Sequence, residues 1–182
     1  HDLLLTTPQP TLVSHLARIG YRTVGWMPGL QKPWPEGAFY GFDRLADLDR
    51  LGYRGPPVGY WRVPDQASMA LLQAQELSLD RSRPPRFIVF PTLTSHVPFR
   101  PVAPYQPDWT RLLGEEAYDT AQLAPALAAP ASWLNPVPAY VDSLNYTFQW
   151  LTGYLRDLAP PNLLLIVIGD HQPVAGVTGA NA

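Results

Sequence analysis

One run of six aliphatic residues, Leu163 to Ile168, constrains the fold of this chain more than any other feature. The run is too short to cross a bilayer, and it is too continuous and too β-branched for a surface strand. Such a run is typical of a central strand that is covered on both faces of a parallel sheet. We therefore predict a strand over 163–168, with a ligand-binding crevice beyond its carboxyl end, at Asp170 and His171.

Two more apolar segments have the composition of strands, and three segments have apolar residues at helical spacing. The strands are predicted over 22–26 and 86–91, and the helices over 10–19, 64–79 and 137–158. Because strands and helices alternate along the chain, the sequence predicts an α/β fold with a mainly parallel central sheet. Three strands make a thin sheet for 182 residues, so at least one further strand is expected.

The connections between these elements are expected to be long and stiff, since the chain contains 22 prolines. Residues 27–63 and 100–136 are predicted to be irregular, with a helical turn over 42–51. The sequence contains no internal repeat and no convincing linker, so a single domain over 1–182 is expected.

The composition argues against several classes of protein. A net charge of −2 gives no electrostatic reason to expect a nucleic-acid partner. The absence of cysteine excludes disulfides, thiolate metal ligands and a cysteine nucleophile in this sequence. Its apolar stretches are too short for a transmembrane helix.

Two histidine-containing loops follow predicted parallel strands. Asp170 and His171 come directly after the strand at 163–168, and His96 follows another predicted strand. Since the carboxyl ends of parallel strands meet at one edge of a sheet, His96 is expected to face the same crevice as Asp170 and His171. A carboxylate beside an imidazole forms half of a metal site. His96 with the nearby Arg100 suits an oxyanion of a phosphate or sulfate ester.

Each of these features also has a plain structural explanation. Asp170 could cap a turn, and His171 could be an incidental loop residue. Taken alone, His96 is better explained as a loop histidine beside an aromatic side chain, although the Asp-His pair weakens that explanation. The aromatic and glycine residues from Trp34 to Arg44 could line a substrate pocket, but packing within a loop explains them better.

Several segments resemble motifs of one enzyme family. Thr92–Phe99 is similar to the Thr-Leu-Ser-Ser-His-x-Pro-(Tyr/Phe) segment of sulfatase-like enzymes in the alkaline phosphatase superfamily. Ile168–Pro173 matches the position of the family's (Gly/Ser)-Asp-His-Gly motif, and the helix around Tyr140 is similar to the helix that precedes that motif. Ala38–Asp43 resembles the family's aromatic Gly-(Phe/Tyr)-Asp element. The resemblance is closest to the branch of lipoteichoic acid synthases and phosphoglycerol transferases.

This resemblance implies an alkaline phosphatase-like three-layer sandwich, of which the chain would form an incomplete part. It implies that Asp170 and His171 are two ligands of one divalent cation (Mn, Zn, Mg or Ca), and that His96 contacts the phosphoryl or sulfuryl group. Trp34 matches an aromatic residue near the family's substrate pocket. The implied substrate is a phosphate or sulfate ester, for example of a lipid headgroup or a glycan. The implied location is extracytoplasmic, at the periplasmic face of a bacterial inner membrane.

Two departures from the family pattern matter. Gln172 and Pro173 follow the Asp-His pair, where the family has glycine. The family's nucleophile, a Thr, Ser or formylglycine, lies with an acidic metal ligand before the first helix, and nothing from His1 to Thr11 matches it, since Thr6 and Thr7 have no acidic partner there. We therefore expect a truncated catalytic domain, inactive alone, that lacks its nucleophile and a membrane-anchored N-terminal region.

The sequence accordingly predicts a metal-dependent hydrolase or transferase that acts on phosphate or sulfate esters. The alternative is a non-catalytic α/β module in which His96 and the aromatic loop bind an anionic sugar or lipid headgroup. If the protein is an enzyme, its affinity for a divalent cation should fall in the Asp170→Ala variant. If it is a binding module, it should not depend on a metal. A metallohydrolase that acts through bound water ranks last, because it needs more carboxylate or histidine ligands than can be placed.

Overall fold

The computed structural model describes residues 6, 9–77, 84–131 and 133–179. The chain divides into two compact units. The sheet unit comprises His1–Gly52 and Leu72–Pro91, and the helical unit comprises Tyr53–Leu71 and Thr92–Ala182. Helix α3 (Asp65–Glu76) begins in the helical unit and ends in the sheet unit. This division does not decide whether residues 1–182 fold as a single domain, which stays a prediction.

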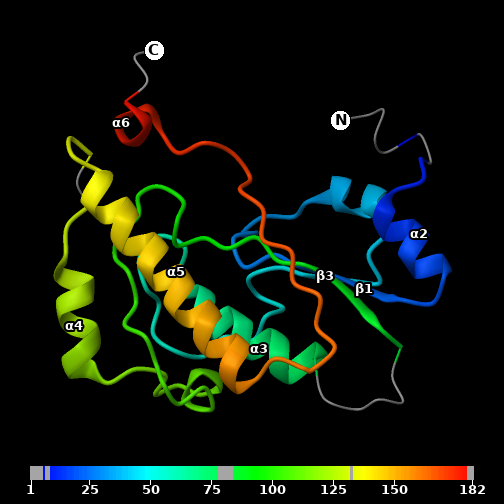
Figure 1. Cartoon of the computed structure of the whole chain (residues 1–182), viewed down its shortest axis with the longest axis horizontal. Coiled ribbons are helices and arrows are strands. Elements are labelled where there is room, and N and C mark those ends of the chain that lie inside the picture. The colour runs from blue at the N-terminus through cyan, green and yellow to red at the C-terminus, as the bar shows by residue number, and fades with distance from the viewer. Residues whose placement is uncertain (1–5, 7–8, 78–83, 132, 180–182) are drawn as a thin grey trace. The chain divides into compact units, whose positions relative to one another are not determined.

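The described part of the sheet unit is built on three parallel strands in the order β2-β1-β3 (Figure 1). Strand β1 is central, and its Val24 is paired with Arg44 on one side and with Ile88 on the other. The α/β class and the parallel sheet are therefore confirmed, as are the strands predicted at 22–26 and 86–91. The observed bounds are Arg22–Trp26 for β1, Arg44–Ala46 for β2 and Arg86–Val89 for β3.

Helix α2 (Leu12–Arg18) precedes β1, as the sequence predicts, but it begins after Pro10. Thr11 caps it, because the Thr11 hydroxyl accepts the Ser14 N–H at 3.0 Å and the Ser14 hydroxyl accepts the Thr11 N–H at 2.9 Å. Gly20 has a φ of +97°, which glycine adopts without strain, and it turns the chain from the helix into β1.

Strand β2 lies where the sequence predicts a helical turn over 42–51. Only the end of that segment turns, where the Leu51 N–H donates to the Asp47 carbonyl at 3.1 Å. The strand itself is placed by side chains: Asp43 accepts the backbone N–H of Thr23 at 2.7 Å, which ties the start of β2 to β1. Gly25 allows the two strands to approach, since a Cβ there would lie 2.8 Å from Cδ1 of Leu45. With β2, the sheet in the described residues has three strands, which is still fewer than the sequence leads us to expect.

A buried carboxylate at the end of α3 binds the sheet. Glu76 is 3% exposed and accepts hydrogen bonds from Arg22 Nε at 2.8 Å and from Arg44 Nη1 at 2.7 Å. These hydrogen bonds hold the pKa of Glu76 below its usual value, and the bond from Arg22 has the largest effect. Arg44 also lies over the Trp26 ring, 5.3 Å from its centroid. We call Arg22, Arg44 and Glu76 the Glu76 cluster.

The helical unit contains the first part of α3 and several further helices (Figure 1). The helices predicted at 64–79 and 137–158 are confirmed as α3 and α5, whereas the segment predicted to be irregular at 100–136 contains two short helices. Within the described residues, no helix is both long and apolar enough to span a membrane. The bounds are Arg111–Leu113 for the 3-10 helix η2, Thr120–Ala128 for α4, Val137–Asp157 for α5 and Ala175–Thr178 for α6.

Helix α5 buries a different face from the one that its apolar spacing indicates. The apolar stripe that indicates this helix in the sequence is largely exposed, with Val141, Phe148 and Leu155 between 47% and 59% exposed. Gly153 lies on the buried face, where a Cβ would be 2.3 Å from the Tyr105 hydroxyl. The large side chains that α5 buries are Tyr146, Trp150 and Tyr154.

The prediction of a buried strand over 163–168 is wrong. This segment pairs with no strand among the residues that the structure describes, and its aliphatic side chains face solvent, with Leu164 83% and Ile168 80% exposed. A strand needs a neighbour that pairs with its backbone N–H and C=O groups. The apolar run predicts burial, but it cannot supply that neighbour.

Candidate functional site

The loop that carries His96 is fixed by a buried carboxylate at the start of α3. Asp65 is fully buried, and its two oxygens accept the N–H groups of Leu93 at 2.8 Å and of Thr94 at 2.9 Å. Burial raises the pKa of Asp65, and these hydrogen bonds oppose that rise. The His96 N–H then donates to the Leu93 carbonyl at 2.9 Å and closes a turn. The backbone beneath His96 is therefore held by α3.

Backbone carbonyls orient the imidazoles of both His96 and His171. Nδ1 of His96 lies 2.8 Å from the Val97 carbonyl oxygen, and Nδ1 of His171 lies 2.8 Å from that of Gln172. Because a carbonyl oxygen only accepts, each Nδ1 must carry the proton. This tautomer leaves Nε2 of each ring to meet a ligand.

Four rings form a continuous edge-to-face series in the helical unit. The centroid separations along the series are 4.9 Å, 5.1 Å and 6.1 Å, and the ring planes are close to perpendicular. Such contacts are attractive, because the positive edge of one ring meets the negative face of the next. The series brings His96 and His171 together, but from a loop and a coil rather than from the ends of two strands. We call Tyr60, Trp61, His96 and His171 the ring cluster.

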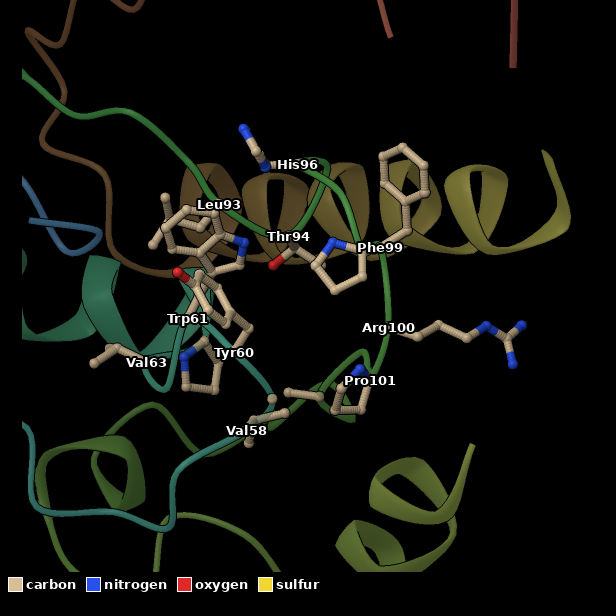
Figure 2. Close-up of a pocket in the computed structure, with 14 residues that line it drawn as sticks. Val58, Tyr60, Trp61, Val63, Leu93, Thr94, His96, Phe99, Arg100 and Pro101 are labelled. Atoms are coloured by element: carbon tan, nitrogen blue, oxygen red, sulfur yellow. The ribbon is translucent and has the colours of Figure 1, made fainter. Parts of the chain in front are cut away.

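A pocket lies beside the ring cluster. Figure 2 shows Trp61 and Val63 on one side of it and Arg100 and Pro101 on the other. The empty volume is about 390 Å³, which includes open solvent. Few polar side chains line the pocket, and His96 and Arg100 are the ones that attract an anion. The exposed lining is polar as well as apolar, and convergent polar groups in a pocket fix the orientation of a small molecule. Apolar lining also comes from Val58, Leu93, Phe99 and Ala103.

Arg100 has a carboxylate partner outside the pocket. Its guanidinium forms an ion pair with Asp142 of α5, and in Figure 2 its side chain extends away from the other labelled residues. The two side chains are 29% and 52% exposed, so water screens their attraction and the pair is weak. To reach an anion in the pocket, the Arg100 guanidinium must leave Asp142 and turn toward the pocket, which the weakness of the pair allows.

The predicted metal ligands Asp170 and His171 are exposed. Their side chains are 98% and 65% exposed, and Oδ2 of Asp170 lies 4.0 Å from Nε2 of His171. Two donors at this distance can bind the same ion, but a protein usually holds a catalytic cation with three or more ligands. Among the residues that the structure describes, no group of three or more His, Asp or Glu side chains could hold a metal. The pair therefore fits two ligands of a cation and does not form a complete site.

Trp34 belongs to the sheet unit and packs within its own loop. It precedes the 3-10 helix η1 (Pro35–Tyr40), and its ring centroid lies 5.5 Å from that of Tyr40. Gly37 makes room for it, since a Cβ there would lie 2.8 Å from Cε3 of Trp34. Loop packing, the explanation that the sequence favours, accounts for this residue. A role for Trp34 in substrate binding stays a prediction.

Sequence reasoning missed Tyr60 and Trp61. They lie in the segment 27–63, for which the sequence predicts only irregular structure. The signal was present as two adjacent aromatic residues between Gly59 and Arg62, but only the fold shows that His96 contacts them. Aromatic residues in a proline-rich loop do not by themselves reveal which histidine they meet.

The family to which this chain belongs follows from a comparison with protein-family models. The model described as Sulfatase matches residues 4–181, a range that contains His96, Arg100, Asp170 and His171. No curated protein and no solved structure matches the chain significantly. The parallel sheet with helices agrees with part of an alkaline phosphatase-like sandwich, and sulfatases act on sulfate esters and typically use a divalent metal. Because the match spans nearly the whole sequence, the chain belongs to the sulfatase family of the alkaline phosphatase superfamily.

Proposed function

We propose that the protein is a hydrolase or transferase of sulfate or phosphate esters, and that the pocket beside the ring cluster binds the charged group of its substrate. The observation that carries this proposal is a convergence in the helical unit. His96 and Arg100 line one pocket, and the His96 ring contacts that of His171, which the sequence places far away. Membership of the sulfatase family supports the reaction class.

The proposed reaction has two group-transfer steps. In the first step, an enzyme hydroxyl oxygen forms a bond to the sulfur or phosphorus atom, the bond from that atom to the leaving oxygen breaks, and the leaving oxygen takes a proton. In the second step, the oxygen of water or of an acceptor alcohol loses its proton and forms a bond to the sulfur or phosphorus atom. The bond from that atom to the enzyme oxygen breaks, and the enzyme oxygen takes up a proton to regenerate the hydroxyl. Negative charge on the non-bridging oxygens must be stabilised throughout both steps.

In this chain, His96 and Arg100 supply that stabilisation. His96 donates to a non-bridging oxygen through Nε2 when both of its ring nitrogens carry protons. Arg100 contributes positive charge as it exchanges Asp142 for the anion. Asp65 acts only as a positioning residue, because it accepts the N–H groups of Leu93 and Thr94 at the start of the turn that carries His96.

The remaining parts of the proposal rest on the family resemblance. We propose that the nucleophile is a Thr, Ser or formylglycine in sequence before His1, and that the protein acts outside the cytoplasm in the manner of the lipoteichoic acid synthase branch. Asp170 and His171 would hold a divalent cation together with an acidic ligand from that same sequence. When bound, such a cation supplies further positive charge to the ester oxygens.

Hydrolysis of 4-nitrophenyl sulfate and 4-nitrophenyl phosphate by the protein of the complete gene tests this function. We expect turnover that a chelator abolishes and a divalent cation restores, and none from the 182-residue chain. Asp170→Ala should weaken the affinity for the cation at least ten-fold, whereas Asp49→Ala, at an exposed carboxylate of the sheet unit, should not change it.

Three results would contradict parts of this account. Normal turnover by the 182-residue chain would show that the nucleophile lies within it. An unchanged cation affinity in Asp170→Ala would remove Asp170 from the metal site. Binding of anionic sugars or lipid headgroups without cleavage or metal dependence would make the protein a binding module instead.

A further inference from the structure

The indole N–H of Trp61 is buried in the protein and has no hydrogen-bond partner among the described residues. Buried polar groups are nearly always paired in native proteins, so an unpaired donor calls for an explanation. Trp61 also lines the pocket beside the ring cluster, together with His96 and Arg100. The side chain that carries the unpaired donor is therefore part of the pocket wall, and the N–H itself lies beneath the surface of that wall.

A short hairpin presents Trp61 at this wall. The Val58 N–H donates to the Arg62 carbonyl at 2.8 Å, and the chain between them makes a tight reversal. Gly59 has a φ of +66°, and a Cβ there would lie 2.6 Å from Cδ of Pro101, which also lines the pocket. Glycine at this position therefore lets the hairpin pack directly against the pocket loop.

The hairpin is held in a strained conformation. Arg62 has a φ of +66°, in the left-handed region that residues with a Cβ rarely adopt. Phe99, in the pocket loop that also carries His96, has a φ of +53°. Strained residues of this kind cluster at ligand-binding sites, where the surrounding structure maintains them. Phe99 lines the pocket, and Arg62 lies between two residues that line it.

The neighbours of Trp61 restrict what it can bind. The His96 ring meets the Trp61 ring edge to face at a centroid distance of 5.1 Å, so a ligand on His96 Nε2 lies close to the indole. The indole N–H is a neutral donor that cannot accept. An oxygen of a sulfate or phosphate group, which only needs to accept, matches it. A tetrahedral oxyanion has enough oxygens to meet His96, Arg100 and Trp61 together.

We propose that Trp61 is a substrate-binding residue whose indole N–H donates to a non-bridging oxygen of the sulfate or phosphate ester. This inference rests on the proposed function, because it places a third donor in the same oxyanion site. The substrate class is a monoester whose charged group is small enough to enter between the hairpin and the His96 loop. Tyr60, which is 66% exposed at the hairpin tip, is then adjacent to the remainder of the ester.

A second tryptophan in the helical unit provides a matched control. The Trp109 indole N–H is likewise buried without a hydrogen-bond partner in the described structure, but Trp109 packs against Tyr154 and does not line the pocket. Tryptophan to phenylalanine removes the same N–H at either site and retains an aromatic ring. A difference between the two variants therefore reports on the pocket rather than on the loss of a buried donor.

The experiment is an NMR titration of the 182-residue chain labelled with ¹⁵N-tryptophan, which has six indole N–H signals. Inorganic sulfate and inorganic phosphate are the probes. The Trp61 signal, assigned with Trp61→Phe, should move downfield and saturate, and the Trp109 signal should not move. Trp61→Phe should weaken anion affinity about ten-fold, as the loss of one hydrogen bond to a charged group does, and Trp109→Phe should leave it unchanged.

The possible outcomes distinguish a failure of the inference on Trp61 from a failure of the proposed substrate site. The same titration of a ¹⁵N-histidine-labelled sample reports on His96. If the anion shifts the His96 signals there, but the Trp61 signal stays still and Trp61→Phe binds the anion equally well, the inference on Trp61 is wrong and the proposed site survives. If neither anion shifts any pocket residue, and His96→Ala leaves ester hydrolysis by the complete protein unchanged, the proposed site itself is wrong.

Discussion

The Glu76 cluster of the sheet unit and the ring cluster of the helical unit both gather polar side chains, but they differ in how those side chains are paired. In the Glu76 cluster, the buried carboxylate is matched by hydrogen bonds from Arg22 and Arg44. In the ring cluster, the Trp61 indole N–H has no partner among the described residues, and the exposed His96 lines a pocket. Matched groups stabilise a fold, whereas unmatched groups beside a pocket are available to a ligand.

This comparison makes burial alone a poor guide to function. Glu76 has a shifted pKa and a buried carboxylate, the features that often mark an active site, yet its arginine partners account for them fully. Asp65 is also buried, and its partners are the backbone N–H groups that shape the His96 loop. Substitutions in the two units should therefore separate stability from ligand binding.

The largest expected effect is on catalysis. His96→Ala in the complete protein should lower kcat/KM for a sulfate or phosphate ester by about 10²–10³-fold, since it removes a donor to the charge that develops on the ester oxygens. Steady-state kinetics measure this loss. His15→Ala, at an exposed histidine of α2 in the sheet unit, is the control and should retain normal kinetics. Equal kinetics for the two variants would remove the ring cluster from the site.

Asp65→Asn should affect both properties. The amide keeps the size of the carboxylate but replaces one acceptor with a donor, so one of the Leu93 and Thr94 N–H groups loses its partner. We expect a loss of about 2–3 kcal/mol in the free energy of unfolding, measured by urea denaturation. Anion affinity should also fall, because the His96 loop is held less firmly. A destabilised variant with unchanged anion affinity would show that Asp65 does not position His96.

Glu76→Gln should lower stability and leave anion binding unchanged. The expected loss at neutral pH is about 1–2 kcal/mol, because the arginines are partly exposed and water compensates them in part. The pKa of Glu76 is lowered on folding, so its stabilising contribution is complete above its ordinary value of 4.5 and disappears as pH falls through the folded-state value. The difference between wild type and variant should therefore shrink in acid. A constant difference would mean that the ion pairs are not its source.

Arg100→Gln should have the smallest effect on the fold. Its ion pair with Asp142 is exposed, so unfolding stability should change by less than about 0.5 kcal/mol. Anion affinity should still fall by several-fold, because a positive charge leaves the pocket wall. Asp142→Asn makes the opposite test, since it frees Arg100 and should strengthen anion binding slightly. Weaker binding in Asp142→Asn would show that the pair orients Arg100 rather than competing with the anion.

Local sequence patterns predicted most of the helices and two of the strands, and they failed where long-range pairing decides. The segment 163–168 has the composition of a buried strand, but it lies exposed because no strand pairs with it in the described structure. Helix α5 was predicted from its apolar spacing, yet Tyr146 and Trp150 lie on the face that it buries. Strand β2 was missed because Asp43 and Gly25 place it through contacts with β1.

The candidate site shows the same division. His96, Asp170 and His171 were recognised from the sequence, since they lie in the segments Thr92–Phe99 and Ile168–Pro173, which resemble motifs of the family. Trp61 was not, because its importance depends on a hairpin that packs against the pocket loop and on an N–H left without a partner. Both are properties of the folded chain that no spacing in the sequence encodes.

The most direct test of the central claim is where an oxyanion binds on this chain. In a titration of the ¹⁵N-histidine-labelled 182-residue chain with inorganic sulfate, the His96 side-chain signals should shift and saturate, while those of His15, on α2 of the sheet unit, should not. Saturable shifts at His96 alone or at His96 and His171 support the pocket beside the ring cluster as the substrate site. Equal, non-saturating shifts at His15 and His96, or a silent His96, would contradict it.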